Sequence, residues 1–277
     1  MIADLHIHTY FSDGTRSPEE VVEEAKQNGI GLISVCDHNS IASFPRLKKA
    51  CDSRNITCIS GAEIDCLFGG LNIHILAYNC RADNPSFINL LKTTNDIMEQ
   101  MSVDLVEKMS VDYPQIGLKE YEVFNRTPVN GGWKGIDYLK SKGFTVSYPE
   151  CMKYYREYGA KCSSSFQTME TVCGVIHNAG GLAVLAHPGE RLDKTTSNFM
   201  KSLYGINNLG IDGIECYYPS HNKEITDICV NFCRGNDLLI TAGSDSHGDF
   251  ASFIDGIHYA IGAVKVDIND LNLKGLI

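Results

Sequence analysis

The chain has 277 residues, of which 43% are hydrophobic and 21% charged, and this length suits one large α/β domain or one domain with an insertion. Its formal charge of −10 argues against long-range attraction to nucleic acid or to an anionic membrane, so we expect no stable binding of duplex nucleic acid. No stretch approaches about 18 uninterrupted apolar residues. The eleven cysteines form no Cys-x-x-Cys pair and follow no secretory leader, so we expect free thiols, a cytoplasmic location and no membrane association.

The first residues are typical of a strand with one polar face. Side chains alternate along Asp4-Leu5-His6-Ile7-His8, which places Asp4, His6 and His8 together. Two such imidazoles point the same way and suit a shared metal ion. Asp13 follows in a loop that Gly14 allows to turn tightly. Taken alone, the segment also fits an ordinary polar strand face.

Strands and helices then alternate along the chain. Ser17-Pro18-Glu19-Glu20 predicts the capped start of a helix. Short apolar strands are expected to end in Cys36-Asp37-His38-Asn39 and in Gly61-Ala62-Glu63, and a further strand over residues 71–78 contains His74. This alternation predicts βαβ units and a parallel sheet.

The alternation breaks in the middle of the chain. Apolar residues recur at helical spacing from Pro85 to Met109, and the following polar and aromatic stretch predicts a short helix over residues 136–142. We expect residues 84–167 to form an inserted, mostly helical subdomain that caps the substrate. The barrel domain would then comprise residues 1–83 and 168–277.

Three more strands are expected after the insertion. They end in Ala186-His187-Pro188, in Gly213-Ile214-Glu215-Cys216 and in Gly243-Ser244-Asp245-Ser246-His247. About seven strands in total are enough to close a small (β/α) barrel. The α/β class therefore follows from the alternation, and the barrel follows from the number of strands.

Ionisable side chains gather at the ends of these strands, where barrel enzymes build their sites. Six of the nine histidines are among them, together with four carboxylates: His6, His8, His38, His74, His187, His247, Asp13, Asp37, Glu63 and Asp245. Each one alone fits a satisfied core polar group, but burying all of them without a counter-ion would be unfavourable. A polynuclear site for divalent metals removes this difficulty, because imidazole suits zinc, manganese and iron while a carboxylate can bridge two ions.

The motifs Asp-Leu-His-Ile-His-Thr, Cys-Asp-His-Asn, Gly-Ala-Glu-Ile, Ala-His-Pro and Gly-Ser-Asp-Ser-His follow one another in this order. In this order they resemble the signatures of the PHP (polymerase and histidinol phosphatase) family. The resemblance covers the barrel portion and implies a metal-dependent phosphoesterase on a distorted (β/α)7 barrel. It further implies two to three divalent ions (manganese, zinc or iron). The chain is similar to stand-alone members with a helical insertion, some of which act on nucleoside 3′,5′-bisphosphates or short oligonucleotides.

Carried onto this chain, the resemblance implies a trinuclear metal site. The first ion would be held by His6, His8, Glu63 and Asp245. The second would be held by Glu63, which bridges, with His74 and His187. The third would be held by Asp13, His38 and His247. Asp37, which directly precedes the ligand His38, is expected to assist catalysis without binding a metal itself, by fixing the orientation of an imidazole.

Two residues outside the metal motifs are candidates for substrate contacts. A histidine in a context similar to that of His221 lies near the substrate phosphate in relatives, so His221 is a candidate phosphate contact or leaving-group acid. A surface histidine at a helix start is the alternative. Arg191 is a candidate bidentate clamp for a second phosphate, with a solvated loop arginine as the alternative. His177 and His258 we interpret as structural.

The insertion departs from the pattern of the bisphosphate phosphatases, which share a Thr-Arg-x-His-like segment. The corresponding place here is Asn130-Gly131-Gly132-Trp133-Lys134, which has neither that arginine nor that histidine. Lys134 or Arg126 is the candidate substitute for the phosphate anchor. Trp133 is a candidate to stack on a base, although attaching the insertion to the barrel is a slightly favoured alternative.

The expected activity is hydrolysis of a small phosphorylated substrate by metal-activated hydroxide, with nucleotide bisphosphates or short oligonucleotides preferred. A histidinol-phosphate-type phosphomonoesterase is the nearest alternative. An amidohydrolase-like hydrolase of C–N bonds is another, but no lysine is placed to be a carboxylated bridging ligand, a role that Glu63 fills. A non-catalytic regulatory PHP module is disfavoured by the complete ligand set. The oligomeric state stays open.

Overall fold

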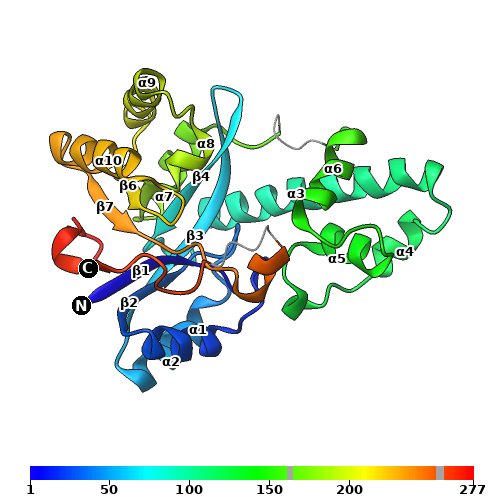
Figure 1. The fold of residues 1–277 in the computed structure, drawn as a ribbon, viewed down its shortest axis with the longest axis horizontal. Coiled ribbons are helices and arrows are strands. Elements are labelled where there is room, and N and C mark those ends of the chain that lie inside the picture. Colours follow the sequence, from blue (N-terminus) through cyan, green and yellow to red (C-terminus); the bar gives the residue numbers. More distant parts are fainter. Residues whose placement is uncertain (161–164, 254–258) are drawn as a thin grey trace.

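The computed structural model describes residues 1–160, 165–253 and 259–277, and its strands form one sheet that curls toward closure (Figure 1). The sheet order is β7-β6-β5-β4-β3-β2-β1-β8. The strands are β1 (Ile2–Ile7), β2 (Ile30–Val35), β3 (Thr57–Phe68), β4 (Leu71–Tyr78), β5 (Leu182–Leu185), β6 (Gly213–Tyr217), β7 (Leu239–Ala242) and β8 (Val266–Asp267). This arrangement confirms the predicted α/β barrel.

The barrel closes where the segment after β7 meets β1. The segment after β7 reaches the end of β1, where Asp245 N donates to His6 O at 2.8 Å and His8 N donates to Ser246 O at 2.9 Å. β8 pairs antiparallel with the start of β1. Seven strands, β1 to β7, therefore surround one interior, as expected.

One strand runs against the predicted direction. β4 pairs antiparallel with both β3 and β5, whereas the other neighbours among β1–β7 are parallel. The reason is a tight hairpin: Gly69 and Gly70, with φ of +57° and +83°, form the two-residue connection between β3 and β4. The expectation of a parallel sheet was wrong for β4, and β3 continues to Phe68 instead of ending at Glu63.

Helices cover the outside of the barrel, and apolar residues from several strands fill its interior. The covering helices are α1 (Pro18–Gln27), α2 (Phe44–Arg54), α7 (Met169–Asn178), α8 (Pro188–Arg191), α9 (Thr196–Asn207) and α10 (Lys223–Gly235). α1 begins with the predicted capping box of Ser17 and Glu20. The interior cluster includes Leu5, Leu32 and Tyr78, closed by Leu276 near the C-terminus. Two 3-10 turns, η2 (Gly248–Phe253) and η3 (Ile268–Asp270), follow β7.

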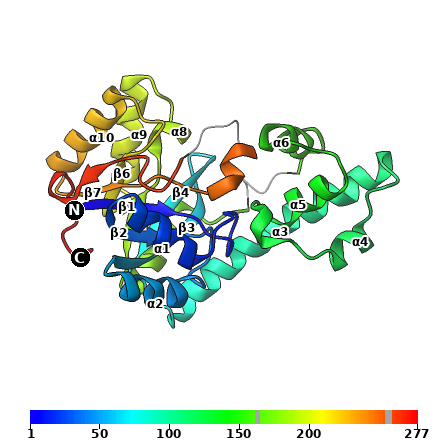
Figure 2. The same cartoon turned by 60° about the horizontal axis from the view of Figure 1, so that its bottom comes forward.

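The insertion extends from one side of the barrel (Figures 1 and 2). It contains α3 (Pro85–Asp112), α4 (Leu118–Val123), η1 (Pro128–Asn130), α5 (Lys134–Ser141) and α6 (Tyr148–Glu157). The C-terminal half of α3 shares an apolar cluster with α4, α5 and α6 that includes Leu105, Tyr121 and Ile136, and Phe250 after β7 joins it. The start of α3 packs instead into a cluster of the barrel, through Phe87, Leu90 and Leu91. In the described ranges, no helix is long and apolar enough to cross a bilayer.

Candidate metal centre

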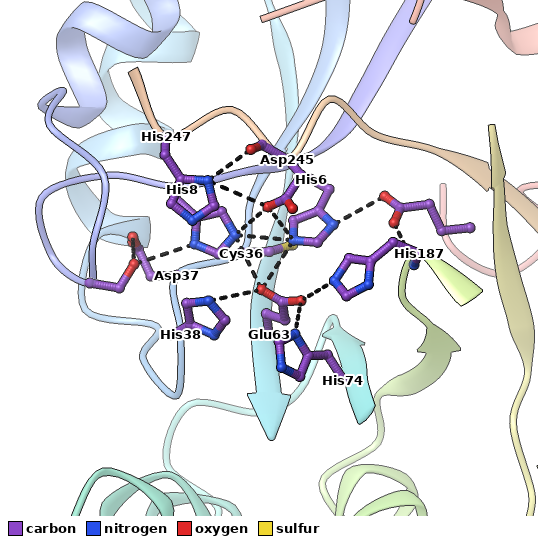
Figure 3. Close-up of polar contacts among 12 residues, drawn as sticks. His6, His8, Cys36, Asp37, His38, Glu63, His74, His187, Asp245 and His247 are labelled. Carbon is purple, nitrogen blue, oxygen red and sulfur yellow. Dashed lines mark hydrogen bonds and ion pairs between the residues drawn. The ribbon is translucent and has the colours of Figure 1, made fainter. Parts of the chain in front are cut away.

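The strand ends bring histidines and carboxylates from both halves of the barrel to one place (Figure 3). Glu63 lies at the middle of this group, and imidazoles surround it. Ligand atoms of its members form three groups, each within 4.8 Å: His6, His8, Glu63 and Asp245; His8, Asp13, His38 and His247; and His38, Glu63 and His74. Histidine nitrogens and carboxylate oxygens at such separations are a typical ligand set for divalent metals.

The first group contains the four residues assigned above to the first ion. The Nε2 atom of His6 lies 3.3 Å from Glu63 Oε2 and 3.4 Å from Asp245 Oδ1. The Nε2 atom of His8 lies 3.2 and 3.0 Å from the same two oxygens. Apart from these imidazoles, buried Asp245 Oδ1 has no hydrogen-bond partner among the described residues, which suits an oxygen that binds metal.

The second group lies on the other side of His8. Asp13 Oδ2 is 3.2 Å from His247 Nε2 and 3.7 Å from His38 Nε2, and these three residues are those assigned to the third ion. His8 adds its Nδ1 atom, 3.4 Å from Asp13 Oδ1. His8 therefore faces the first group with one ring nitrogen and the second group with the other.

The third group differs from the assignment in one residue. His74 Nδ1 lies 2.7 Å from Glu63 Oε1, and His38 Nε2 lies 3.3 Å from Glu63 Oε2. This group corresponds to the second ion, to which the resemblance assigns Glu63, His74 and His187. His38 takes the place of His187 in the group, although His187 Nε2 lies 2.8 Å from Glu63 Oε1. The two oxygens of Glu63 thus face imidazoles on opposite sides, which suits a bridging carboxylate.

Mutual attraction dominates the electrostatics of this centre. Burial disfavours the charged imidazole, yet the carboxylates outweigh it: Glu215, Glu63 and Asp245 raise the pKa of His6 well above its usual value. Burial is likewise outweighed at His8, whose pKa rises to about 10. At Glu63 and Asp245, burial raises the pKa, but the neighbouring imidazoles hold it well below its usual range. Such concentrated opposite charges are typical of functional sites.

Two carboxylates that sequence reasoning did not assign belong to the same site. Asp65 is buried on β3, 3.3 Å from His74 Nε2, and it accepts hydrogen bonds of 3.1 Å from the amides of Asn39 and Asn72. Glu215, the middle residue of β6, lies 3.1 Å from His6 Nδ1. The period-two spacing of Glu63 and Asp65 on a longer strand was a usable signal for Asp65.

Asp37 acts on a loop and not on the ring beside it. It accepts hydrogen bonds of 2.8 Å from the backbone N–H of Thr9, from the Thr9 hydroxyl and from the Ser12 hydroxyl. None of its hydrogen bonds within the described ranges reaches the imidazole of His38. Burial raises the pKa of Asp37. The carboxylate turns toward the loop after β1, where the Ser12 hydroxyl that it binds lies 3.4 Å from His8 Nδ1. That Asp37 fixes the orientation of an imidazole therefore stays a prediction, and His8 is the ring that these contacts indicate.

A pocket of about 780 Å³ opens over the centre. Its walls come from the strand ends on one side and from the insertion on the other, including Met98, Trp133 and Tyr148. The volume fits a ligand of nucleotide size. Ligand-sized space therefore meets the metal-binding groups at the junction of barrel and insertion.

The four predicted substrate contacts in the pocket wall differ in how far their polar groups are already engaged. Arg191 lines the pocket with its NH2 atom 3.3 Å from His74 Nε2. Lys134 also lines it, but its ammonium lies 3.5 Å from Glu99 Oε1. Arg126 donates to the carbonyl oxygens of Ser12, Gly132 and Tyr10. Trp133 donates from Nε1 to Tyr155 Oη at 2.8 Å. Arg126 thus joins the insertion to the loop after β1, and Trp133 joins the segment before α5 to α6.

His221 stands apart from the pocket. Its Nε2 atom accepts from the backbone N–H of Gly189 at 3.0 Å, and its Nδ1 atom donates to Cys216 O at 3.0 Å. With both ring nitrogens bound to backbone, His221 has no atom free for a phosphate or a leaving group. The catalytic interpretation of His221 is therefore corrected. His177 is exposed and pairs with Asp212 at 2.9 Å, whereas His258 lies outside the described residues.

The fold and these groups define the class: an α/β-barrel protein with a metal-binding centre at its strand ends. The model of the PHP domain family matches residues 4–121, which carry the first three motifs and the ligands from β1 to β4. Over these residues the chain is similar to the PHP domain family.

Curated relatives cover nearly the whole chain. A 5′-3′ exoribonuclease of Haemophilus influenzae is 28% identical over 249 residues, which are 88% of this chain and 89% of the relative. A phosphoribosyl 1,2-cyclic phosphate 1,2-diphosphodiesterase of Eggerthella lenta is 25% identical, covering 90% and 95%. A 3′,5′-nucleoside bisphosphate phosphatase of Chromobacterium violaceum is 23% identical, covering 88% and 86%.

A solved structure shares the fold. A Bifidobacterium adolescentis protein named as a metal-dependent phosphoesterase superposes with a TM-score of 0.75 and 23% identity, covering 97% of this chain and 93% of that one. At this identity the likeness bears on the fold alone. The fold includes the insertion, because almost the entire chain is matched.

Proposed function

We propose that this chain is a metal-dependent phosphoesterase that hydrolyses a small phosphorylated substrate, with nucleoside bisphosphates and short oligonucleotides preferred. The observation that carries the proposal is the convergence of three ligand groups that share His8, His38 and Glu63 beneath a pocket of about 780 Å³. Relatives named for phosphatase, phosphodiesterase and exoribonuclease activity support hydrolysis of a phosphoester bond.

The residues of the centre would hold two to three divalent ions of manganese, zinc or iron. The first set is His6, His8, Glu63 and Asp245. Asp13, His38 and His247 form another set, and Glu63 with His74 and His187 would complete a third. When bound, such ions neutralise the charge of a phosphate and lower the pKa of water at the site.

The side chains of this centre then have defined roles in hydrolysis. Glu63 would bridge because its two oxygens face different imidazoles, at 2.7 Å from His74 and 3.2 Å from His8. Glu215 lies against Nδ1 of His6 and Asp65 against Nε2 of His74, so the other nitrogen of each ring faces Glu63. No serine or cysteine nucleophile is required, and Asp37 serves by holding the loop that carries Asp13.

We assign residues 84–167 the role of a substrate cap over the barrel formed by residues 1–83 and 168–277. The separate apolar cluster of α3 to α6 and the insertion side chains in the pocket wall support this division. Arg191 remains the proposed anchor for a second phosphate. Arg156 on α6 also lines the pocket and makes no ion pair with the described residues, so we add it to this role.

The cytoplasm is the proposed location. The ten cysteines in the described part of the chain are all free thiols, as in reducing compartments. Two of them, Cys216 and Cys233, lie with sulfur atoms 3.7 Å apart without forming a disulfide.

Phosphate release tests the proposed function. Protein reconstituted with Mn²⁺, Zn²⁺ or Fe²⁺ would be assayed with a nucleoside 3′,5′-bisphosphate, a short oligonucleotide, histidinol phosphate and an amide panel. We expect hydrolysis of phosphoesters and none of amides. A single turnover in ¹⁸O-labelled water should place the label in inorganic phosphate when the substrate is a phosphomonoester, and in the phosphate group of the released nucleotide when it is an oligonucleotide. Amide cleavage alone, or a trapped covalent phosphoprotein, would contradict the proposal.

A further inference from the structure

β6 is the strand to which the sequence assigns no metal ligand. The nine predicted ligands come from β1, β2, β3, β4, β5 and β7 or from the loops that follow them. In the middle of β6 lies Glu215, whose side chain is 0% exposed. A carboxylate so deeply buried needs partners that compensate its charge and its lost hydration.

Glu215 finds those partners in two residues of the proposed metal centre. Its Oε1 atom lies 3.1 Å from His6 Nδ1, and its Oε2 atom accepts the backbone N–H of His187 at 2.9 Å. His6 lies on β1 and His187 follows β5, so the carboxylate connects strands on both sides of the barrel. Each oxygen has its own partner.

The contact with His6 determines which ring nitrogen faces the ligand group. Because Nδ1 points at Glu215, Nε2 points at Glu63 Oε2, at 3.3 Å, and at Asp245 Oδ1, at 3.4 Å. A carboxylate behind a metal-binding imidazole fixes the tautomer and the ring orientation and raises the basicity of the ligand nitrogen.

The contact with His187 holds an unusual backbone conformation. His187 has a φ of +26°, which residues other than glycine rarely adopt. The hydrogen bond to Glu215 ties down its N–H group, while its Nε2 atom lies 2.8 Å from Glu63 Oε1. Loss of this bond would free the segment that presents the imidazole.

The neighbouring strand leaves room for this carboxylate. A Cβ atom at Gly243, just after β7, would lie 2.2 Å from Glu215 Oε1 and 2.3 Å from His6 Cβ. No side chain fits at such distances. Glycine is therefore required at position 243 for Glu215 and His6 to meet as they do.

We propose that Glu215 is a positioning residue for metal binding: it fixes the ring of His6 and the backbone of His187 without being a ligand itself. This inference rests on the proposed metal centre. It gives β6 a part in the site through hydrogen bonds instead of coordination.

Metal affinity and spectroscopy test the inference in E215A and E215Q. Asp137→Asn is the matched control, because Asp137 is also a buried carboxylate that accepts a backbone N–H, at 2.7 Å from Thr127, but lies in the insertion. We expect E215A to weaken Mn²⁺ binding about 10- to 100-fold in calorimetric titration, with a smaller loss in E215Q and none in D137N. The visible spectrum of the Co²⁺-loaded protein should change only in the Glu215 variants.

A second readout follows the proton on Nδ1 of His6. In zinc-loaded protein with ¹⁵N-labelled histidine, the Nδ1–H resonance of His6 should be sharp in the wild type and exchange with water in E215A. If E215A does not fold, E215Q and Gly243→Ala replace it, and both should lose affinity. Wild-type Mn²⁺ affinity and an unchanged Co²⁺ spectrum in the folded Glu215 variants would overturn the inference. A wild type that takes up no metal would instead overturn the proposed centre, and this inference with it.

Discussion

At the scale of single residues, the centre depends on a few side chains that serve two neighbours at once. His8 turns one ring nitrogen to Glu63 and the other to Asp13, at 3.2 and 3.4 Å. Glu63 likewise divides its oxygens between His74 and His6, at 2.7 and 3.3 Å. Removing a shared residue should therefore affect more than one ligand group, whereas an unshared residue should affect only one.

Glu63→Gln and Asp13→Asn separate these two cases. We expect E63Q to lose most of its bound metal and to lower kcat by at least about 100-fold, since about 3 kcal/mol of transition-state stabilisation goes with the ions. Asp13→Asn should lose about one metal equivalent and retain the rest. Metal content by plasma mass spectrometry, measured beside phosphate release, checks both. Equal metal content in the two variants would contradict the shared role of Glu63.

At the scale of elements, the two faces of the pocket come from parts of the chain with different properties. The strand ends present the ligands, while α6 of the insertion and α8 of the barrel present Arg156 and Arg191 to the same pocket. Arg126 and Lys134 already have partners, at 2.6 Å to Tyr10 O and 3.5 Å to Glu99. Arg156 and Arg191 make no ion pair with the described residues, and the 3.3 Å contact of Arg191 is with the imidazole of His74, so these two are better suited to meet an additional anionic group.

Arg156→Ala and Arg191→Ala test this division of roles. Each should raise KM for a nucleoside 3′,5′-bisphosphate roughly tenfold and leave the matching monophosphate nearly unchanged, because only the former offers a second phosphate. Lys153→Ala on the same helix α6 is the control, since Lys153 is exposed, pairs with Glu157 and does not line the pocket. Steady-state kinetics with both substrates measure the effect. A similar KM increase for the monophosphate would argue against a second-phosphate anchor.

At the scale of the whole molecule, the buried charges make stability depend on pH and on metal. In metal-free protein, the pKa of His8 is raised from 6.5 to about 10. Its contribution to stability is therefore complete below its unfolded value and is lost as pH rises through its folded value. Glu63 and Asp245 have lowered pKa values, so their contributions are present above their ordinary values of 4.5 and 3.8 and are lost as pH falls.

Metal-free protein should consequently be most stable between about pH 4.5 and 6.5, and its Tm should fall toward about pH 9. Bound ions replace the protons, so Mn²⁺ should raise Tm more at the higher pH. Thermal melts across this pH range, with a chelator or with Mn²⁺, provide the measurement. A metal-free Tm that stays constant or rises between about pH 6.5 and 9 would contradict the expectation.

The sequence by itself determined the α/β barrel, the metal-binding character of the strand ends and most of the ligand candidates. Strands could be predicted because side chains that alternate between apolar and polar point to opposite faces of a strand, which is a local property of the chain. The site could be predicted because the histidines and carboxylates within Gly-Ser-Asp-Ser-His and Asp-Leu-His-Ile-His lie at strand ends, where barrel proteins build their sites. The capping box of Ser17 and Glu20 is equally local, and it formed as predicted.

Only the tertiary structure decided how these groups share the site. The hydrogen bond from Gly189 to His221 and the position of Glu215 behind His6 depend on contacts between residues far apart in the chain. The reversal of β4 and the placement of Asp65 beside His74 follow from the hairpin between β3 and β4, which the strand pattern did not indicate. Spacing along the chain cannot reveal such contacts, because a ring nitrogen or a carboxylate oxygen takes whichever partner the packed barrel brings within hydrogen-bond distance.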